Sequence, residues 1–440
     1  MDYNIFKRIA PAMPNPSRGT EIVKLLLSQA SKDMRETLVP MAIPALAAHL
    51  SDVKFMYSDN KYYELCGQMG HLIGPSGIGK AQLSHLLEAI MRPFREHDEK
   101  EFEKLANWQR LVKTRGANKE KPERPDVSFW LPPSDLTNPA FIQNAMALEK
   151  LGGRTMYLNL PEVEMADRMC GGHRQVSQTI RNIYDRQRAG ALRATADGVT
   201  GNPILRVNMT FSSTPEAARS FYKKDMTNGF FSRIPFVYKG RGERQGKIPR
   251  QGNYDEAFLQ KLDEHIQRLS ACKGHFVVKP LNKMADQLAE EMASLADLAD
   301  DDVLFELSHR SIFSAWKKAA TLWILNDQTW TRSIGEFMRW FCYYDLWSKV
   351  KVFGDMFKSE DTQDTQKGAP KNMLECLDKS FNEHELEALR VQLGKSKEGT
   401  KHQLRVWKNR GFIEYSAQTG LYTQTEKYKT PSDSPSRGRK

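Results

Sequence analysis

The feature that most constrains the fold is a glycine-rich stretch, GPSGIGK, at residues 74–80. An apolar stretch, GHLI, precedes it and an amphipathic stretch, QLSHLLEAIM, follows, so the order predicts a strand, a loop and a helix. Glycines at this spacing let backbone N–H groups turn toward phosphate oxygens, while the lysine reaches the terminal phosphates. The alternative is an unrelated glycine-rich turn. We predict nucleotide binding through Gly74, Pro75, Ser76, Gly77, Ile78, Gly79, Lys80, Ala81 and Gln82.

The residue after the lysine is Ala81, where loops of this kind usually place Ser or Thr. The hydroxyl at that position ligates Mg²⁺, and a methyl group cannot. Because Mg²⁺ readily keeps several waters, a water can take that coordination position. We therefore expect ATP and Mg²⁺ as cofactors, with weak metal affinity and with hydrolysis in doubt.

Two carboxylates, Glu162 and Glu164, follow the apolar stretch TMYLNL at 155–160. Hydrolysis at such a loop needs one carboxylate that orients the attacking water and another that serves the metal. We assign the first role to Glu162 and the outer shell of the metal to Glu164, although Pro161 stands where an acidic residue is usual. The alternative is that both are solvated carboxylates at the start of the next helix.

A single arginine, Arg233, lies in NGFFSRIPF at 228–236, at the start of a strand candidate. A guanidinium there could reach the γ-phosphate bound by a neighbouring subunit and neutralise charge in the transition state. A salt-bridged surface arginine is the alternative.

The order of apolar stretches predicts an α/β fold. Strand candidates occur at 127–131, 155–160, 203–213 and 234–240, and the helix between the first two ends at a pair of glycines. Strands that alternate with helices predict a mostly parallel sheet covered on both faces. Residues 1–55 predict helices broken at prolines, about 95–125 an exposed charged helix and loop, and 250–355 further long helices.

Composition favours a polyanionic partner without requiring one. The net charge is +11 and the pI about 9.2, which fits either nucleic acid or a solvated basic surface. The 5 cysteines form no C-x-x-C pair, so we expect reduced thiols, with neither a disulfide framework nor a zinc site. No segment reaches the roughly 18 apolar residues that span a bilayer. We therefore expect a cytoplasmic location and no membrane partner.

Several segments resemble one known family when taken in order. They are KYYELCGQMGHLIGPSGIGK, YLNLPEVEMADRM, TFSSTPEAARSFY, NGFFSRIPFVY and SHRSIFSAWKKAATLWIL. The chain resembles a P-loop ATPase family of unknown function from bacterial mobile elements and prophages, often primase-associated, whose members look like AAA+ or superfamily-three-type helicases. The resemblance implies a nucleotide site of Lys80, Glu162, Ser213 and Arg233, with Arg310 as a lid arginine. It also implies a ring-shaped homo-oligomer, with six subunits as the family expectation, and a primase or other replication protein as partner. The chain departs from the family at Ala81 and at Leu160–Pro161.

Arginines gather between the carboxylates and the next strand candidate. In ring-shaped helicases this interval often carries an element that projects into the pore, where arginines grip a phosphate backbone without reading bases. The alternative is a solvated helix face with salt bridges between subunits. The predicted DNA contacts of this interval are Arg174, Arg181, Arg186, Arg188 and Arg193.

The C-terminal part predicts a winged helix, with two helices followed by a hairpin. Leu386, Leu389 and Leu393 would face inward from the first helix, and Leu404 and Trp407 from the second. The second helix would have Thr400 as its N-cap and would end at Gly411. The second helix would enter a DNA groove through Lys401, Arg405 and Lys408. Winged helices also dock proteins, so that alternative stays open.

The domains expected from these observations begin with a helical segment at 1–55 and an ATPase core at 56–245. A helical lid at 246–357, a linker at 358–372, a winged helix at 373–428 and a disordered basic tail at 429–440 would follow. The expected function is an ATP-dependent DNA helicase or translocase that replicates a mobile element. A nucleotide-binding initiator or assembly protein with little hydrolysis is the main alternative, and a transposition regulator or defence ATPase is a third.

Overall fold

The structure is a computed structural model that describes residues 5–6, 10–114, 122–166, 173–190, 192–193, 198–226, 229–241, 252–357 and 370–428, without the side chains of 173–175. Most of the predicted linker and all of the predicted tail lie outside these residues. Contacts divide the chain into two compact units. The sheet unit comprises 16–279 and 317–334, and the helical unit comprises 1–15, 280–316 and 335–440. This division differs from the predicted domain boundaries, which stay predictions. Within the described ranges, no helix combines the length and apolar character needed to cross a membrane.

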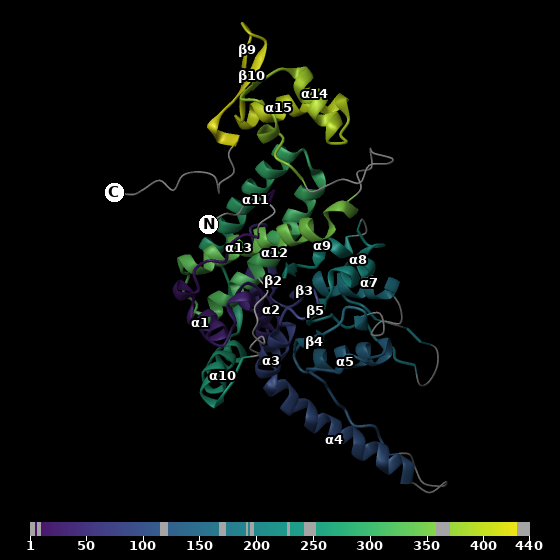
Figure 1. Ribbon diagram of the computed structural model, residues 1–440. Helices are drawn as coiled ribbons and strands as arrows, with labels where there is room; N and C mark the ends of the chain where they lie inside the picture. Colours follow the sequence, from purple (N-terminus) through teal and green to yellow (C-terminus); the bar gives the residue numbers. More distant parts are fainter. Residues whose placement is uncertain are drawn as a thin grey trace. The chain divides into compact units, whose positions relative to one another are not determined.

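A parallel four-stranded sheet is the centre of the sheet unit, which confirms the predicted mixed α/β class (Figure 1). Its strand order is β4-β5-β3-β6, and every neighbouring pair runs parallel. The carboxyl ends of all four strands therefore share one edge, where loops can bring distant residues together. The strands are β3 (Met69–Ile73), β4 (Met156–Leu160), β5 (Val207–Ser213) and β6 (Phe236–Tyr238).

Helices cover both faces of this sheet, as predicted. Helix α2 (Arg35–Ala48) lies on one face, where a side chain on Gly70 of β3 would meet the Met41 sulfur at 2.9 Å. The next residue of β3, His71, faces the other side and contacts Tyr222 at the end of α8 (Pro215–Tyr222). Neighbouring residues of a strand point to opposite faces, so α2 and α8 cover different sides.

The prolines of the N-terminal region do not break its helices, which corrects the sequence prediction. Pro40 and Pro44 both lie inside α2. Proline removes a helical hydrogen bond, but α2 is buried from Thr37 to Ala48, and this packing outweighs local propensity. The carbonyl oxygen of Pro44 accepts a hydrogen bond from the Asn208 side chain of β5, 2.9 Å away.

The predicted strand at 127–131 is not a strand. Its backbone instead bonds to side chains of α4 (Arg92–Thr114) and α5 (Asn138–Lys150). The Asp98 carboxylate accepts from the N–H groups of Trp130 and Leu131 at 2.8 and 2.7 Å. Asn144 makes two hydrogen bonds with the Phe129 backbone. These acceptors replace a strand ladder, although the Trp130 carbonyl still receives one bond from Tyr157 of β4. Figure 1 shows α4 as a long helix that extends away from the sheet.

A second, smaller sheet of the sheet unit has the order β2-β1-β7. Its centre packs against the C-terminal part of α12, where the Phe55 and Trp323 rings meet edge to face at 5.5 Å. The sequence prediction did not include these strands, which are β1 (Val53–Met56), β2 (Tyr62–Glu64) and β7 (Gly274–Phe276). Further helices among the described residues of this unit are α1 (Glu21–Ser28), α3 (Lys80–Ile90), α7 (His173–Tyr184), α9 (Phe230–Arg233) and α10 (Glu256–Ala271).

The helical unit contains most of one long helix, parts of two others, and a small C-terminal module. Helices α12 (Asp302–Leu325) and α13 (Arg332–Phe353) each cross between the units, and α11 (Lys279–Ala299) lies in the helical unit from its second residue. The module contains α14 (Glu383–Gln392) and α15 (Thr400–Arg410) and an antiparallel sheet of order β8-β10-β9. Its strands are β8 (Ser380–Phe381), β9 (Ile413–Ser416) and β10 (Leu421–Gln424). The helix pair and the hairpin are confirmed as elements.

Candidate functional site

The glycine-rich loop forms the turn between β3 and α3. Gly77 and Gly79 have φ angles of 80° and 88°, a region that residues with side chains rarely adopt. Gly74 has no room for a side chain, because a Cβ there would collide with Ile78 and lie 2.8 Å from the carbonyl oxygen of Lys239. The glycine spacing is therefore required by the backbone of this loop.

Several N–H groups of the loop are available to a ligand. In the described part of the chain, the backbone N–H groups of Ser76, Gly77, Ile78 and Gly79 donate to no acceptor. Ser76 and Gly77 are also exposed. The first turn of α3 adds the positive end of an 11-residue helix. Together these groups can hold an anion of several oxygens.

Lys80 connects two strand ends. Its Nζ donates to the carbonyl oxygens of Gly74 and Ser213, each 3.1 Å away. Partial burial lowers the pKa of this lysine, and the charge of the Glu162 carboxylate opposes that shift. Glu162 therefore lies close enough to act electrostatically on the ammonium group. The ends of β3, β5 and β4 thus bring together three of the four residues predicted for the nucleotide site.

The hydroxyl of Ser213 points into the protein interior. Its Oγ lies 2.8 Å from Nε2 of His71, and the other ring nitrogen, Nδ1, lies 2.9 Å from the Tyr222 hydroxyl. Burial lowers the pKa of His71 to about 3, and the positive charge of Lys80 acts in the same direction. The ring is therefore neutral near pH 7, with one nitrogen donating and the other accepting. Ser213 offers its carbonyl oxygen to Lys80, and its hydroxyl is already occupied.

The two predicted carboxylates, Glu162 and Glu164, are exposed just beyond β4. Ser212 of β5 donates to the carbonyl oxygen of Pro161, which fastens this strand end to its neighbour. Among the described residues, no three His, Cys, Asp or Glu side chains gather as metal ligands. This donor set does not fit a metal held by protein alone. It fits Mg²⁺ that arrives on phosphate oxygens and keeps its waters, with one carboxylate nearby.

The two residues after Lys80 differ in their surroundings. Ala81 is exposed at the start of α3 and presents a methyl group. The Gln82 side chain is buried, accepts from the backbone N–H and hydroxyl of Ser31 at 3.3 Å, and donates to the Gln29 carbonyl at 3.2 Å. These hydrogen bonds attach α3 to the segment between α1 and α2. They direct the Gln82 side chain toward that segment and not toward the glycine-rich loop.

Arg233 is engaged within its own chain. Its Nε and Nη2 donate to Oδ2 of Asp185 at 3.0 and 2.7 Å, and its Nη1 donates to the Gly229 carbonyl at 2.6 Å. It also lies over the Tyr184 ring. Arg233 precedes β6, whereas the glycine-rich loop follows the parallel strand β3, so the two lie at opposite edges of the sheet. One chain therefore does not bring Arg233 to Lys80.

Arg310, the predicted lid arginine, lies in the N-terminal part of α12 and is half-buried. That part of α12 belongs to the helical unit, whereas the loop belongs to the sheet unit. The predicted role of Arg310 stays a prediction.

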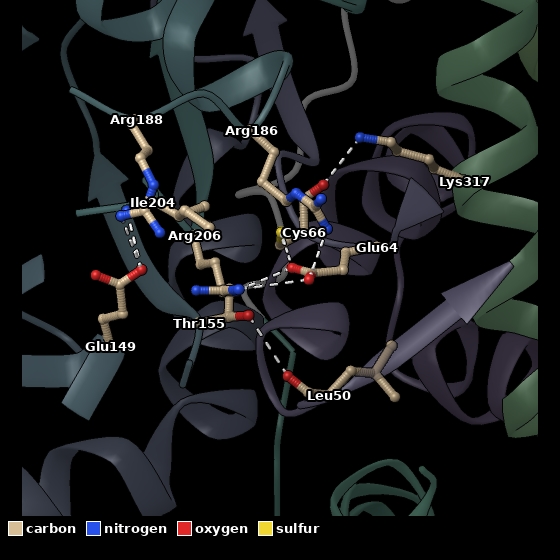
Figure 2. A network of polar contacts seen from close by, with 10 residues as sticks. All are labelled: Leu50, Glu64, Cys66, Glu149, Thr155, Arg186, Arg188, Ile204, Arg206 and Lys317. Atoms are coloured by element: carbon tan, nitrogen blue, oxygen red, sulfur yellow. Dashed lines mark hydrogen bonds and ion pairs between the residues drawn. The ribbon is translucent and has the colours of Figure 1, made fainter. Parts of the chain in front are cut away.

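Two of the predicted DNA-binding arginines form ion pairs within the chain (Figure 2). Glu64 of β2 lies between Arg206 and Arg186, with N–O distances of 2.9 and 2.5 Å. Burial alone would raise the pKa of Glu64, but the hydrogen bonds and charges of the two arginines lower it. Arg188 pairs with Glu149 of α5 at 3.4 Å. These pairings were not predicted, because Glu64 and Glu149 are distant in sequence and no local pattern marks them.

Residues 187–189 and 203–205 run antiparallel and form the base of an arm. Arg188 and Ile204 pair as an isolated bridge, and Ala189 donates to the Pro203 carbonyl. Beyond this base, Leu192 is 89% exposed. Arg193 is also exposed, and its side chain has no partner among the described residues. Residues 191 and 194–197 lie outside the described residues, and the predicted DNA contact through Arg193 stays a prediction.

The remaining arginines of this interval lie on α7. Arg181 is half-exposed, with its Nε near the Ser177 carbonyl at 3.3 Å and its Nη2 near the Gln178 side chain at 2.8 Å. The backbone of Arg174 also belongs to α7, but its side chain lies outside the described residues. Both predicted DNA contacts stay predictions.

Helix α15 presents basic side chains to solvent. Leu404 and Trp407 are buried in a core that includes Leu386 of α14, as predicted. Gly411 ends the helix with a φ of 73°, also as predicted, whereas Thr400 is its first residue and Gly399 its N-cap. The α15 basic face is the set of exposed side chains of Lys401, Arg405 and Lys408.

Comparison with models of known protein families gives no match, and no curated protein matches the sequence. Conclusions about function therefore depend on the residues of this chain.

Proposed function

We propose that this chain binds ATP at the glycine-rich loop and uses it, as a P-loop ATPase of AAA+-like type, to translocate on or open DNA. The observation that carries the proposal is the position of Lys80, which spans the ends of β3 and β5 beside Glu162. A lysine, a nearby carboxylate and free N–H donors at the start of a helix are what a triphosphate requires.

Each residue has one role in this proposal. The N–H groups of Ser76 to Gly79 bind the phosphate oxygens, and Lys80 exchanges one of its two carbonyl acceptors for the terminal phosphates. Glu162 orients the attacking water. Mg²⁺ bound to the phosphates would neutralise their charge. Because Ala81 gives that ion no ligand, we expect it to be held weakly and turnover to be slow.

Two surfaces would meet DNA. The α15 basic face offers three exposed cations on one helix, which supports a winged helix whose second helix enters a groove. The arm offers Arg193 beside an exposed Leu192, a pairing suited to a flexible single strand with a charged backbone and apolar base faces. A ring of subunits and a primase partner belong to the same proposal.

One assay tests the chemistry. Purified protein is tested for ATP binding and for ATPase activity, with and without single-stranded DNA, alongside Lys80→Ala, Glu162→Gln and Ala81→Ser. We expect Lys80→Ala to lose binding, Glu162→Gln to bind ATP but lose turnover by roughly 100-fold or more, and Ala81→Ser to strengthen the Mg²⁺ dependence. Unchanged DNA-stimulated activity in Lys80→Ala would contradict the proposal.

A second function is favoured by a specific observation. All three guanidinium nitrogens of Arg233 are engaged with Asp185 and Gly229, and its side chain is only 16% exposed. An arginine held this way does not reach a neighbour's phosphate unless its contacts open. A DNA-binding initiator that holds ATP with little hydrolysis agrees with this and with Ala81. In the same assay it would bind ATP tightly but show no turnover, with or without DNA.

A further inference from the structure

A buried row of three polar side chains lies below the glycine-rich loop. His71 of β3 is fully buried, as is Tyr222, and Ser213 is 6% exposed. The ring of His71 contacts one hydroxyl through each nitrogen, at 2.8 Å to Ser213 and 2.9 Å to Tyr222. The aromatic rings of Phe211 and Phe236 also contact it, so these surroundings would otherwise suit an apolar side chain.

The row ends at the lysine of the loop. Ser213 is the last residue of β5, and its carbonyl oxygen accepts from both the Lys80 ammonium and the Gly74 N–H, each at 3.1 Å. The bond from His71 to the Ser213 hydroxyl fixes the side chain of the same residue. A residue held at both its side chain and its carbonyl has little freedom to turn, so the acceptor for Lys80 stays at one place.

We propose that His71 is a positioning residue for phosphate binding, which holds Ser213 so that Lys80 is directed at the terminal phosphates of a bound nucleotide. This inference rests on the proposed nucleotide binding and adds a residue to it. His71 does not touch the nucleotide and acts only through Ser213 and Lys80. Tyr222 completes the row by satisfying the second ring nitrogen.

A purely structural role predicts a different pattern. If His71 only stabilised the fold, its substitutions would change the melting temperature and weaken all nucleotides alike. If it positions Lys80, the loss should fall on ATP, whose terminal phosphates the lysine reaches, and should spare AMP. The ratio of the dissociation constants for ATP and AMP therefore separates the two roles.

Three substitutions of His71 test which ring nitrogen matters. His71→Gln places an amide near the position of Nε2 and keeps a partner for Ser213. His71→Asn places it near Nδ1 and keeps a partner only for Tyr222, while His71→Phe keeps neither. Dissociation constants for ATP and AMP would be measured on the full chain by equilibrium dialysis, with melting temperatures recorded without nucleotide.

We expect His71→Gln to bind ATP within about twofold of the unchanged chain, and His71→Asn and His71→Phe to bind it about five- to tenfold more weakly, which is the order of one hydrogen bond. AMP binding should stay constant. Should His71→Phe fail to fold, Ser213→Ala removes the same contact and should give the same selective loss. The double variant His71→Gln/Ser213→Ala should bind ATP as weakly as Ser213→Ala alone, because the new amide then has no hydroxyl to hold.

The outcomes distinguish the positioning role of His71 from the proposed nucleotide binding on which it rests. Equal ATP-to-AMP ratios in all the His71 variants, with Lys80→Ala still defective, would overturn the positioning role and leave the nucleotide site intact. An ATP affinity that follows the melting temperatures would overturn it as well. If the unchanged chain binds no ATP, or Lys80→Ala binds it equally well, the proposed function fails and the inference falls with it.

Discussion

At the scale of single residues, some side chains of the candidate site can be identified from a sequence motif, whereas others are brought together only by the fold. The loop glycines and Lys80 belong to one short pattern, and their backbone angles and contacts follow from it. His71 is one position in an apolar strand, and its partners Ser213 and Tyr222 lie 142 and 151 residues further along the chain. Its proposed role depends on the pairing of strands that are distant in sequence, which no short stretch of sequence reveals.

Asp185 is a second residue of that kind, and it controls the only arginine predicted to act in trans. It accepts two hydrogen bonds from Arg233, and its neighbour Arg186 has a positive φ of 52°, so the backbone there is constrained. A partly buried ion pair of this geometry contributes on the order of 1 kcal/mol. That amount must be overcome before Arg233 can turn toward another subunit.

If Arg233 acts on a neighbouring subunit, Asp185→Asn should raise DNA-stimulated ATPase activity about two- to fivefold, because it weakens the competing partner. Steady-state ATPase assays at a fixed protein concentration check this, with Arg233→Ala expected to abolish the gain. Glu149→Gln is the matched control, since it removes the ion pair with Arg188 and should leave the rate unchanged. A lower rate in Asp185→Asn, with an unchanged melting temperature, would show that Asp185 holds Arg233 in its working position.

At the scale of elements, the sequence identifies strands and helices well where apolar periodicity and burial agree. The strand β4 matches its predicted range to within one residue, and α5 ends at glycines with positive φ as expected. The errors have physical causes. Inside α2, burial outweighs two prolines. At 127–131, side chains of Asp98 and Asn144 satisfy backbone groups that a strand would have paired.

The arginines of the arm and the neighbouring residues show that sequence alone does not reveal which charges are paired. Five arginines in one interval suggest a continuous basic surface, but Arg186 and Arg188 hold the base of the arm through Glu64 and Glu149. Only the described end of the arm, with Arg193, presents a side chain that has no partner among the described residues. Among the described side chains of this interval, the number of arginines therefore overestimates the number of cations without an acidic partner.

Arg193→Ala should weaken single-stranded DNA binding about fivefold and lower the slope of log affinity against log salt by about 0.7, the value for one phosphate contact on a single strand. Its melting temperature should not change. Arg188→Ala should behave in the opposite way, with a lower melting temperature and an unchanged slope, because its partners are Glu149 and the Asn202 carbonyl. Fluorescence anisotropy at several salt concentrations and thermal unfolding check both. A salt slope left unchanged by Arg193→Ala would exclude Arg193 as a phosphate contact.

At the scale of the whole molecule, the predictable part is the parallel sheet with its loop and the C-terminal helix pair with its hairpin. Both arise from local signals: strand–loop–helix order in one and helical spacing of leucines in the other. The division into two units was not predictable, because α12 and α13 each run through both and no change of composition marks the boundary. Long-range packing decides it.

The net charge of +11 raises one question at this scale. The proposed DNA binding could come from the α15 basic face or from the charge of the chain as a whole. Replacing the three residues of the α15 basic face with alanine lowers the formal charge from +11 to +8, since 11 − 3 = 8. A control with Lys223, Lys224 and Lys273, all exposed, changed to alanine has the same charge. Any effect of net charge must therefore appear equally in both.

If the face enters a duplex groove, its variant should lose affinity for double-stranded DNA by about tenfold or more at 0.15 M salt, with the salt slope lowered by roughly 2–3 for three phosphate contacts. The control should stay within about twofold, because its three lysines lie outside the α15 basic face and exposed charges are largely screened beyond a Debye length of about 8 Å. Anisotropy titrations with a labelled duplex at three salt concentrations check this. Equal losses would assign binding to overall charge. A loss in neither variant would leave α15 as a protein-docking helix, with Lys401, Arg405 and Lys408 facing an acidic partner instead of phosphate.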